Sequence, residues 1–360
     1  MMRSLYSGIS GLRNHQTRMD VIGNNIANVN TIGYKAARTV FQDVFCQTAQ
    51  SGSANQAFNF GMGGTNPIQI GLGVRLSTID VLHGPAAMQR TDRPLDMMIN
   101  DDGYFTVGVP NPMHPAPFAS VDVLVNGDPD ADPPIEPVGD PEEYGFPAGT
   151  TWENAPRFTY LYTRAGDFKM DNEGFLVTSH GYYVMGYKVD AYVLIDGEFE
   201  LYDPEDEDHQ DLPIYWRSEL TEWMSQDEED RGPPPVPQAI RIGDEQVGFS
   251  VDNDGMINII EDNRRRSIFQ LTLAMFANPE GLEKVGNSLY RESPSSGESN
   301  LTIAKNMGAG SVSGGGLEMS NVDLASEFTD MIVTQRGFQA NSRIITVSDT
   351  MLEELINLKR

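Results

Sequence analysis

The sequence predicts an α+β fold: long helices at the two chain ends pair as a coiled coil, and between them lies a mainly-β middle domain with a small inserted outer domain. Three observations support this prediction. Both ends of the chain repeat apolar residues at spacings of three and four. The middle alternates apolar and polar residues in short runs divided by Gly-containing turns. Two acidic ranges interrupt those runs.

The C-terminal helix has the longest pattern, with spacings that alternate between four and three residues without a slip. Its seam positions are Leu324, Phe328, Met331, Gln335, Phe338, Ser342, Ile345, Asp349, Leu352 and Ile356. Ser320 and Asp323 stand at capping-box spacing just before it, so we expect the helix to begin there. Three polar seam positions suggest control of register and partner choice. An ordinary core helix is the alternative.

The N-terminal segment mirrors this pattern over about residues 3–30, before the turn-like VNTIGYK. Its apolar positions are Leu5, Ile9, Leu12, Met19, Ile22 and Ile26. Together with the apolar seam positions of the C-terminal helix, they form a predicted self-assembly seam. A membrane-surface helix is the alternative, but such a helix carries many Lys and Arg on its polar face. This segment has three Arg among Asn, Gln and Ser.

We expect four kinds of segment along the chain. The terminal helical domain is 1–45 and 318–360; the linker arms are 46–73 and 305–317; the β-rich middle domain is 74–109, 157–189 and 238–304; the acidic inserted outer domain is 110–156 and 190–237. The arms are rich in Gly and polar residues, which is typical of linkers. Both arms therefore connect the helical pair to the middle of the chain.

The middle domain reads as strands at 74–82, 158–163, 181–189, 238–243 and 268–276. Three similar segments, at 99–105, 170–176 and 251–257, place Asn and Asp before Gly between apolar residues. Such dipeptides supply the positive φ angles of tight hairpins. Calcium loops are the alternative, but an EF-hand loop needs alternating ligands and a distal Glu, which none of the three has.

The two acidic ranges carry most of the net charge of −27. Residues 110–156 hold nine acids and no Lys or Arg, and residues 190–235 hold 16 acids against two Arg. Acidic, Pro-rich sequence by itself suggests disorder. All three Trp of the chain lie in these ranges, which favours a small folded appendage instead. The acids at 203–208 suggest either loose cation binding or a solvated face.

Several function classes are excluded by the sequence. The negative charge does not suit nucleic acid, and no apolar run approaches the roughly 18 residues of a membrane span. The N-terminus lacks the apolar core of a cleaved signal peptide. Cys46 is the single cysteine, and the five His form no metal-ligand pattern. We find no catalytic motif, so we expect no enzyme, no catalytic or metal residues and no cofactor.

Three ordered motifs carry a family resemblance. They are MDVIGNNIANVNTIGYK at 19–35, QRTDRPLDMMINDDGYF at 89–105 and EMSNVDLASEFTDMIVTQRGFQANSRIITVSDTMLEELINLKR at 318–360. Together they resemble the bacterial flagellar axial proteins of the rod and hook. The second motif has Arg93 where many members have Gly or Asn. The acidic ranges have no counterpart in this resemblance.

Within that family, the chain is most similar to hook proteins of Gram-positive type. The resemblance implies a homopolymer that forms a curved tubular universal joint, which transmits motor torque to the filament. It also implies export without a cleaved signal peptide by the flagellar type III apparatus, an extracellular location, and contact with the hook cap and with rod and hook-filament junction proteins. The long arm at 46–73 makes the distal rod protein the alternative. A secreted adhesin is a further one.

Overall fold

A computed structural model of the chain describes residues 2–52, 65–110, 158–195, 198–201, 214–225, 235–242, 248–261 and 264–358. The chain divides into two compact units, and each unit collects separate stretches of sequence. The first unit is Met1–Asn30, Lys35–His83 and Ser320–Arg360, and the second is Thr31–Tyr34 and Gly84–Met319. Helices dominate the first and strands the second, so the predicted α+β class is confirmed.

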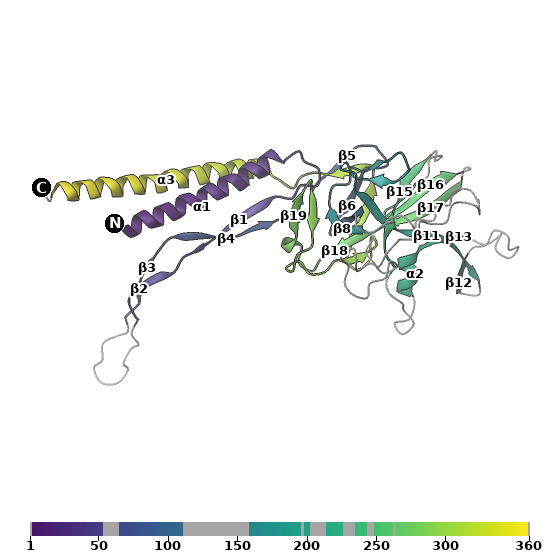
Figure 1. The fold of residues 1–360 in the computed structure, drawn as a ribbon, viewed down its shortest axis with the longest axis horizontal. Coiled ribbons are helices and arrows are strands. Elements are labelled where there is room, and N and C mark those ends of the chain that lie inside the picture. Colours follow the sequence, from purple (N-terminus) through teal and green to yellow (C-terminus); the bar gives the residue numbers. More distant parts are fainter. Residues whose placement is uncertain are drawn as a thin grey trace, which may run out of the picture. The chain divides into compact units, whose positions relative to one another are not determined.

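The first unit consists of two long helices and two successive β-ribbons. Helix α1 (Met2–Ala27) packs antiparallel on α3 (Leu324–Asn357), so both chain ends lie at the same end of the pair (Figure 1). Strand β1 (Ala37–Asp43) pairs with β4 (Val74–Val81), and both also contact α1. Strand β2 (Cys46–Gln50) pairs with β3 (Ile68–Gly71). The ends of the predicted arm at 46–73 therefore form a ribbon.

The start of α3 differs slightly from the prediction. The residue that caps the helix is Asp323, whose Oδ1 accepts a hydrogen bond from Ala325 N at 3.0 Å. The hydroxyl of Ser320 accepts from Val322 N at 3.3 Å, before the helix begins. An Asp at this position also places negative charge at the positive end of the helix dipole.

The second unit is built on antiparallel strands. In a fifteen-stranded sheet, the main series of hydrogen-bonded neighbours is β15–β16–β17–β11–β7–β8–β20–β19. The strands are β5 (Met88–Arg90), β6 (Met97–Asn100), β7 (Tyr104–Pro110), β8 (Phe158–Thr163), β9 (Lys169–Met170), β10 (Leu176–Val177), β11 (Tyr183–Ile195), β12 (Glu198–Leu201), β13 (Ile214–Ser218), β14 (Gln238–Ala239), β15 (Phe249–Val251), β16 (Met256–Glu261), β17 (Arg264–Leu271), β18 (Leu273–Met275), β19 (Glu283–Gly286), β20 (Leu289–Arg291), β21 (Asn300–Thr302), β22 (Ser311–Gly314) and β23 (Gly316–Glu318). Helix α2 (Glu219–Ser225) follows β13, and a 3-10 turn spans Pro279–Gly281.

An ion pair lies within this second unit, between Arg164 and Glu318, whose side chains are 1% and 0% exposed. Arg164 Nη2 also donates to Asp101 O at 2.6 Å, and Glu318 Oε1 accepts from Ala86 N at 3.1 Å. Loss of either partner would leave an uncompensated charge in the core, which costs about 3–5 kcal/mol. The pair therefore ties three separate stretches of this unit together.

Two of the three predicted hairpins are confirmed and one is wrong. Strands β9 and β10 pair around Gly174, and β15 and β16 pair around Gly255, both glycines having positive φ. At 99–105 the chain turns through Gly103, but β6 pairs with β22 and β7 pairs with β8, β11 and β18. The local turn signal was correct there, but distant strands supply the partners.

The Gly-rich stretch at 305–317, expected as a linker, contains strands β22 and β23. Glycine allows close strand contact here: a Cβ at Gly310 would lie 1.6 Å from Asn100 O. Of the acidic ranges, 111–156 lies outside the described residues, as do 202–213 and 226–234. In the described part of 190–237, β12 and β13 pair with β11 and so extend the main sheet.

Candidate functional site

The packed pair of terminal helices is the candidate site, because the predicted seam lies on it. Three side-chain contacts fix its register. Ser4 Oγ lies 3.5 Å from Ser348 Oγ, Arg18 Nη2 lies 2.9 Å from Asp330 Oδ2, and Asn25 Nδ2 donates to Glu327 Oε1 at 3.0 Å. In this register Met2 lies opposite Thr350, so the last turns of α3 extend beyond the start of α1 (Figure 1).

Small residues bring the two helices close together. A Cβ at Gly11 would lie 2.6 Å from Asn341 Nδ2, and one at Gly337 would lie 2.8 Å from His15 Cε1. The His15 ring packs edge-on against Phe41, with 6.3 Å between ring centroids. Burial, followed by the nearby Arg18 charge, lowers the pKa of His15 from its usual 6.5. The neutral ring therefore suits this contact better than the charged one.

Asn25 is the most deeply buried polar side chain of α1, with 1% of its surface exposed. Its Nδ2 donates to Ala37 O at 2.9 Å as well as to Glu327, and its Oδ1 accepts from Ala37 N at 3.0 Å. Asn321 makes a matching pair of bonds, accepting from Ala36 N and donating to Leu82 O, both at 2.8 Å. These two side chains, which we call the asparagine clamp, join α1, the β1–β4 ribbon and the start of α3.

Glu327 completes the clamp and carries a perturbed pKa. Burial raises the pKa of its carboxyl from the usual 4.5, and the hydrogen bond from Asn25 opposes that shift in part. Folding of the first unit therefore makes ionisation of Glu327 less favourable than it is in the unfolded chain.

The predicted seam residues are divided between the interface and the surface. On α3, Met331, Phe338, Ile345 and Leu352 are half-buried, whereas Leu324, Phe328 and Ile356 are exposed. On α1, Ile22 is buried, Ile9 is exposed, and Leu5, Leu12, Met19 and Ile26 are half-buried. The predicted seam of α3 thus consists of two columns of residues. The column of Met331, Phe338, Ile345 and Leu352 lies at the interface with α1, and the column that includes Leu324, Phe328 and Ile356 remains largely exposed.

The second interface column of α3 lies one residue earlier than the apolar pattern suggested. It consists of Glu327, Thr334, Asn341 and Ser348, and both of the buried residues in α3, Thr334 and Ser348, belong to it. Polar residues fit this position because α1 presents glycines, Ser4 and Asn25 opposite to them. Only a pattern search that admits small and polar residues would have found this column.

A second apolar stripe runs along α3 and is open to solvent. Its members Val333, Ile344, Val347, Met351, Leu355 and Leu358 are 44–82% exposed. From Ile344 onward they are separated by three or four residues, so they share one helix face. Exposed apolar faces on a helix are typical of interaction sites. This stripe was missed because the stronger seven-residue repeat runs beside it.

The β2–β3 ribbon also exposes apolar side chains. Ile68, Ile70 and Leu72 are 55%, 44% and 38% exposed, and Phe45 just before β2 is 85% exposed. A two-stranded ribbon without a core is marginal in water. Its stability therefore calls for packing against another surface. The lone cysteine, Cys46, is free and exposed in β2.

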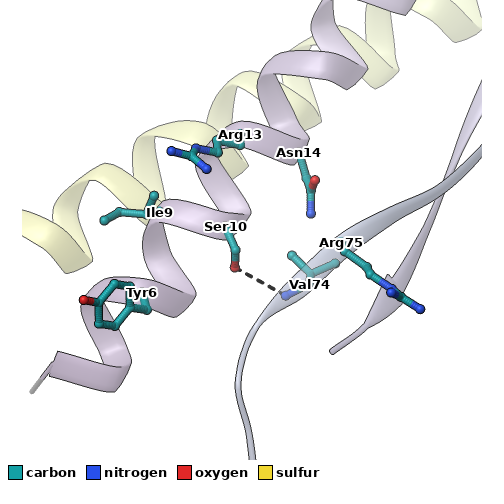
Figure 2. Close-up of a pocket in the computed structure, with 7 residues that line it drawn as sticks. All are labelled: Tyr6, Ile9, Ser10, Arg13, Asn14, Val74 and Arg75. Atoms are coloured by element: carbon teal, nitrogen blue, oxygen red, sulfur yellow. Dashed lines mark hydrogen bonds between the residues drawn. The ribbon is translucent and has the colours of Figure 1, made fainter. Parts of the chain in front are cut away.

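A shallow groove opens between α1 and the beginning of β4, with a volume of about 300 Å³ (Figure 2). Its lining residues are Tyr6, Ile9, Ser10, Arg13, Asn14, Val74 and Arg75. Among the residues that the structure describes, no group of His, Cys, Asp and Glu is placed to hold a metal ion. No described helix is both long and apolar enough to cross a membrane.

Three family models match the chain. The flagella basal body rod protein model matches residues 5–35, the flagellar hook protein FlgE/F/G D1 domain model matches 154–259, and the flagellar basal body rod FlgEFG protein C-terminal model matches 313–358. The first of these covers most of α1, and the last covers all of α3. The matched segments thus include both helices of the candidate site.

Similar proteins span the whole chain. The sequence is 38% identical to the flagellar basal-body rod protein FlgG of Bacillus subtilis, with 100% of both chains covered. It is 32% identical to the flagellar hook protein FlgE of Borreliella burgdorferi and 29% identical to that of Treponema pallidum, again with 100% of both chains covered. Rod and hook proteins therefore both appear among its relatives.

Proposed function

The chain belongs to the family of bacterial flagellar rod and hook proteins, and from that premise we propose that it is the subunit of the flagellar hook. Members of this family are structural proteins of the flagellar axis that polymerise with copies of themselves. The proposed polymer is a curved tube that transmits motor torque to the filament. Family membership lends no support to the adhesin alternative.

The observation that carries this proposal is the open apolar stripe on α3. In a single chain these side chains remain 44–82% exposed although α1 already covers another face of the helix. Burying a Leu or Met side chain stabilises an assembly by about 1.5–3 kcal/mol. A helix with one partner in its own chain and a second apolar face suits a tube in which each helix has several neighbours.

In this proposal the terminal helices form an inner coiled coil around an export channel. The predicted seam residues contribute to it, with the second unit outside and the acidic ranges outermost as an inserted domain. Subunits travel unfolded through the channel from the type III export apparatus and assemble beneath the hook cap. Rod and hook-filament junction proteins adjoin the two ends of the tube.

The distal rod protein is the second candidate. The β2–β3 ribbon and the 38% identity to a protein named FlgG favour it. The acidic sequence that continues after β11, which includes β12, β13 and α2, favours the hook, because an outer domain there would suit a joint whose subunits slide past one another in solvent. Deleting 190–235 should then preserve export and change curvature or stiffness, and a complete loss of secretion would contradict this.

The test is electron microscopy of the purified full chain and of cells that lack it. A hook subunit assembles into curved tubes, and the cells retain complete rods without hooks. Straight tubes, together with basal bodies that lack the distal rod, would support the rod protein instead. A chain that stays monomeric at all concentrations, even when pre-formed hook or rod ends are added as seeds, would refute both candidates.

A further inference from the structure

The groove between α1 and β4 has a fixed floor. The backbone approaches α1 closely at Gly73, where an added Cβ would lie 2.4 Å from Ser10 Oγ and φ is +119°. The next residue, Val74, donates its backbone N–H to Ser10 Oγ at 3.4 Å. Only glycine permits both the conformation and the approach. The groove is therefore a defined feature of the first unit.

The groove combines apolar surface with the positively charged guanidinium of Arg13. Tyr6, Ile9 and Arg13 line the groove along α1. In Figure 2 these three side chains project from α1 on the side away from Val74, whereas Ser10 points toward Val74. Tyr6 is 65% exposed and Ile9 is 38% exposed. Arg13 is also exposed, and no ion pair within the described residues engages its guanidinium.

Two further polar groups border this groove. The Asn14 Nδ2 atom is buried and lacks a hydrogen-bond partner among the described residues. Arg75 differs from Arg13, because Gln42, with its amide oxygen turned toward it, accepts from Arg75 Nε at 2.7 Å. An occupant of the groove should thus be apolar, with a carboxylate for Arg13 and an acceptor for Asn14.

The C-terminal end of α3 has this chemistry. Beyond Thr350 the helix has no α1 residue opposite it, and this overhang is about 12 Å long at 1.5 Å per residue. Met351, Leu355 and Leu358 are 52%, 49% and 82% exposed there. The exposed Glu354 is next to the first and last of these on the helix surface, at spacings of three and four.

The overhang cannot fill the groove of its own chain. The residues of α1 that touch α3 include Gly11, whereas the groove residue Arg13 stands two positions along, on nearly the opposite side of the helix. The two surfaces are therefore both available in one molecule. An interface between two different surfaces of identical chains does not close on itself and extends into a helical polymer.

We propose that the α3 overhang of one copy, Met351 to Leu358, binds in the α1–β4 groove of a second copy, with Glu354 paired to Arg13. The proposal deepens the assembly function and rests on it. It assigns one specific contact between neighbours, and this contact is heterologous. The partner is a second copy of this chain because the charge and apolar character of the two surfaces complement each other.

Disulfide trapping tests the geometry. In a full chain in which Cys46→Ser has removed the native thiol, Ile9→Cys and Leu355→Cys are made as separate variants. Polymers grown from a mixture of the two should yield disulfide-linked pairs of chains, and polymers of either variant alone should yield none. Glu353→Cys mixed with Ile9→Cys is the matched control, because residue 353 lies about 160° from residue 355 around the helix. Equal trapping in this control, or trapping of either variant alone, would overturn the proposal.

Charge reversal tests the pairing. Arg13→Glu and Glu354→Arg should each raise the critical concentration for polymerisation about fivefold to tenfold, as expected when an attraction becomes a repulsion. The double variant should recover most of the loss, whereas Arg13→Glu with Glu353→Arg should not. Circular dichroism of the monomers checks that folding is unchanged. If the wild type polymerises but the double variant is not rescued, this contact alone is refuted. If the wild type never polymerises, the proposed function is refuted as well.

Discussion

The substitution Asn25→Ala should lower the stability of the helix pair in the first unit, although it removes few atoms. The change removes three hydrogen bonds, to Ala37 N, Ala37 O and Glu327 Oε1, at 2.9–3.0 Å. Each such bond contributes about 0.5–1.5 kcal/mol, and unpaired backbone groups add to the cost. Because Ala37 is half-buried and partly reached by water, we expect a loss of about 2–3 kcal/mol in the stability of the helix pair.

Hydrogen exchange of the α1 amides in the full-length monomer measures this loss. A decrease of 2–3 kcal/mol corresponds to exchange about 30- to 150-fold faster. Asn28→Ala is the matched control, since the Asn28 side chain bonds locally to Asn24 O, at 2.9 Å. We expect an effect below about 0.5 kcal/mol for this control. Equal effects of the two substitutions would refute the assignment of Asn25 as a clamp.

Three further predictions concern the same helix pair. Because the pKa of His15 is lowered on folding, its contribution to the stability of the helix pair is complete above pH 6.5 and is lost as the pH falls below that value. The variant His15→Gln should not show this loss on the acid side. A comparison of melting temperatures at pH 5 and pH 7 measures the difference. The raised pKa of Glu327 has the opposite consequence: the helix pair gains stability as the pH falls toward 4.5 and loses it as the pH rises. The variant Glu327→Gln should reduce this dependence of stability on pH and be no less stable than the wild type at pH 7. Phe328→Asp, at a side chain 50% exposed in the monomer, should block polymerisation and leave the melting of the second unit unchanged; normal tubes from this variant would contradict a role for Phe328 in assembly.

The residue pattern predicted the elements whose evidence is local. The seven-residue repeats located α1 and α3 to within a few residues, and Asn or Asp before Gly located turns that the positive φ of Gly174 and Gly255 confirms. Such features follow from backbone geometry and from the spacing of apolar side chains, which a chain carries without knowledge of its partners.

Strand partners and the orientation of the α3 surface depended on tertiary contacts. The stretch at 305–317 looked like a linker because glycine is flexible alone, yet Gly310 is required where β22 approaches β6. An apolar repeat alone could not show that α1 presents glycine and asparagine to Thr334, Asn341 and Ser348. Small and polar residues can be recognised as residues of a close helix contact only when the facing helix is known. The sequence alone therefore determined that terminal helices exist and pair, and the tertiary structure decided which face of α3 pairs with α1 and which remains exposed.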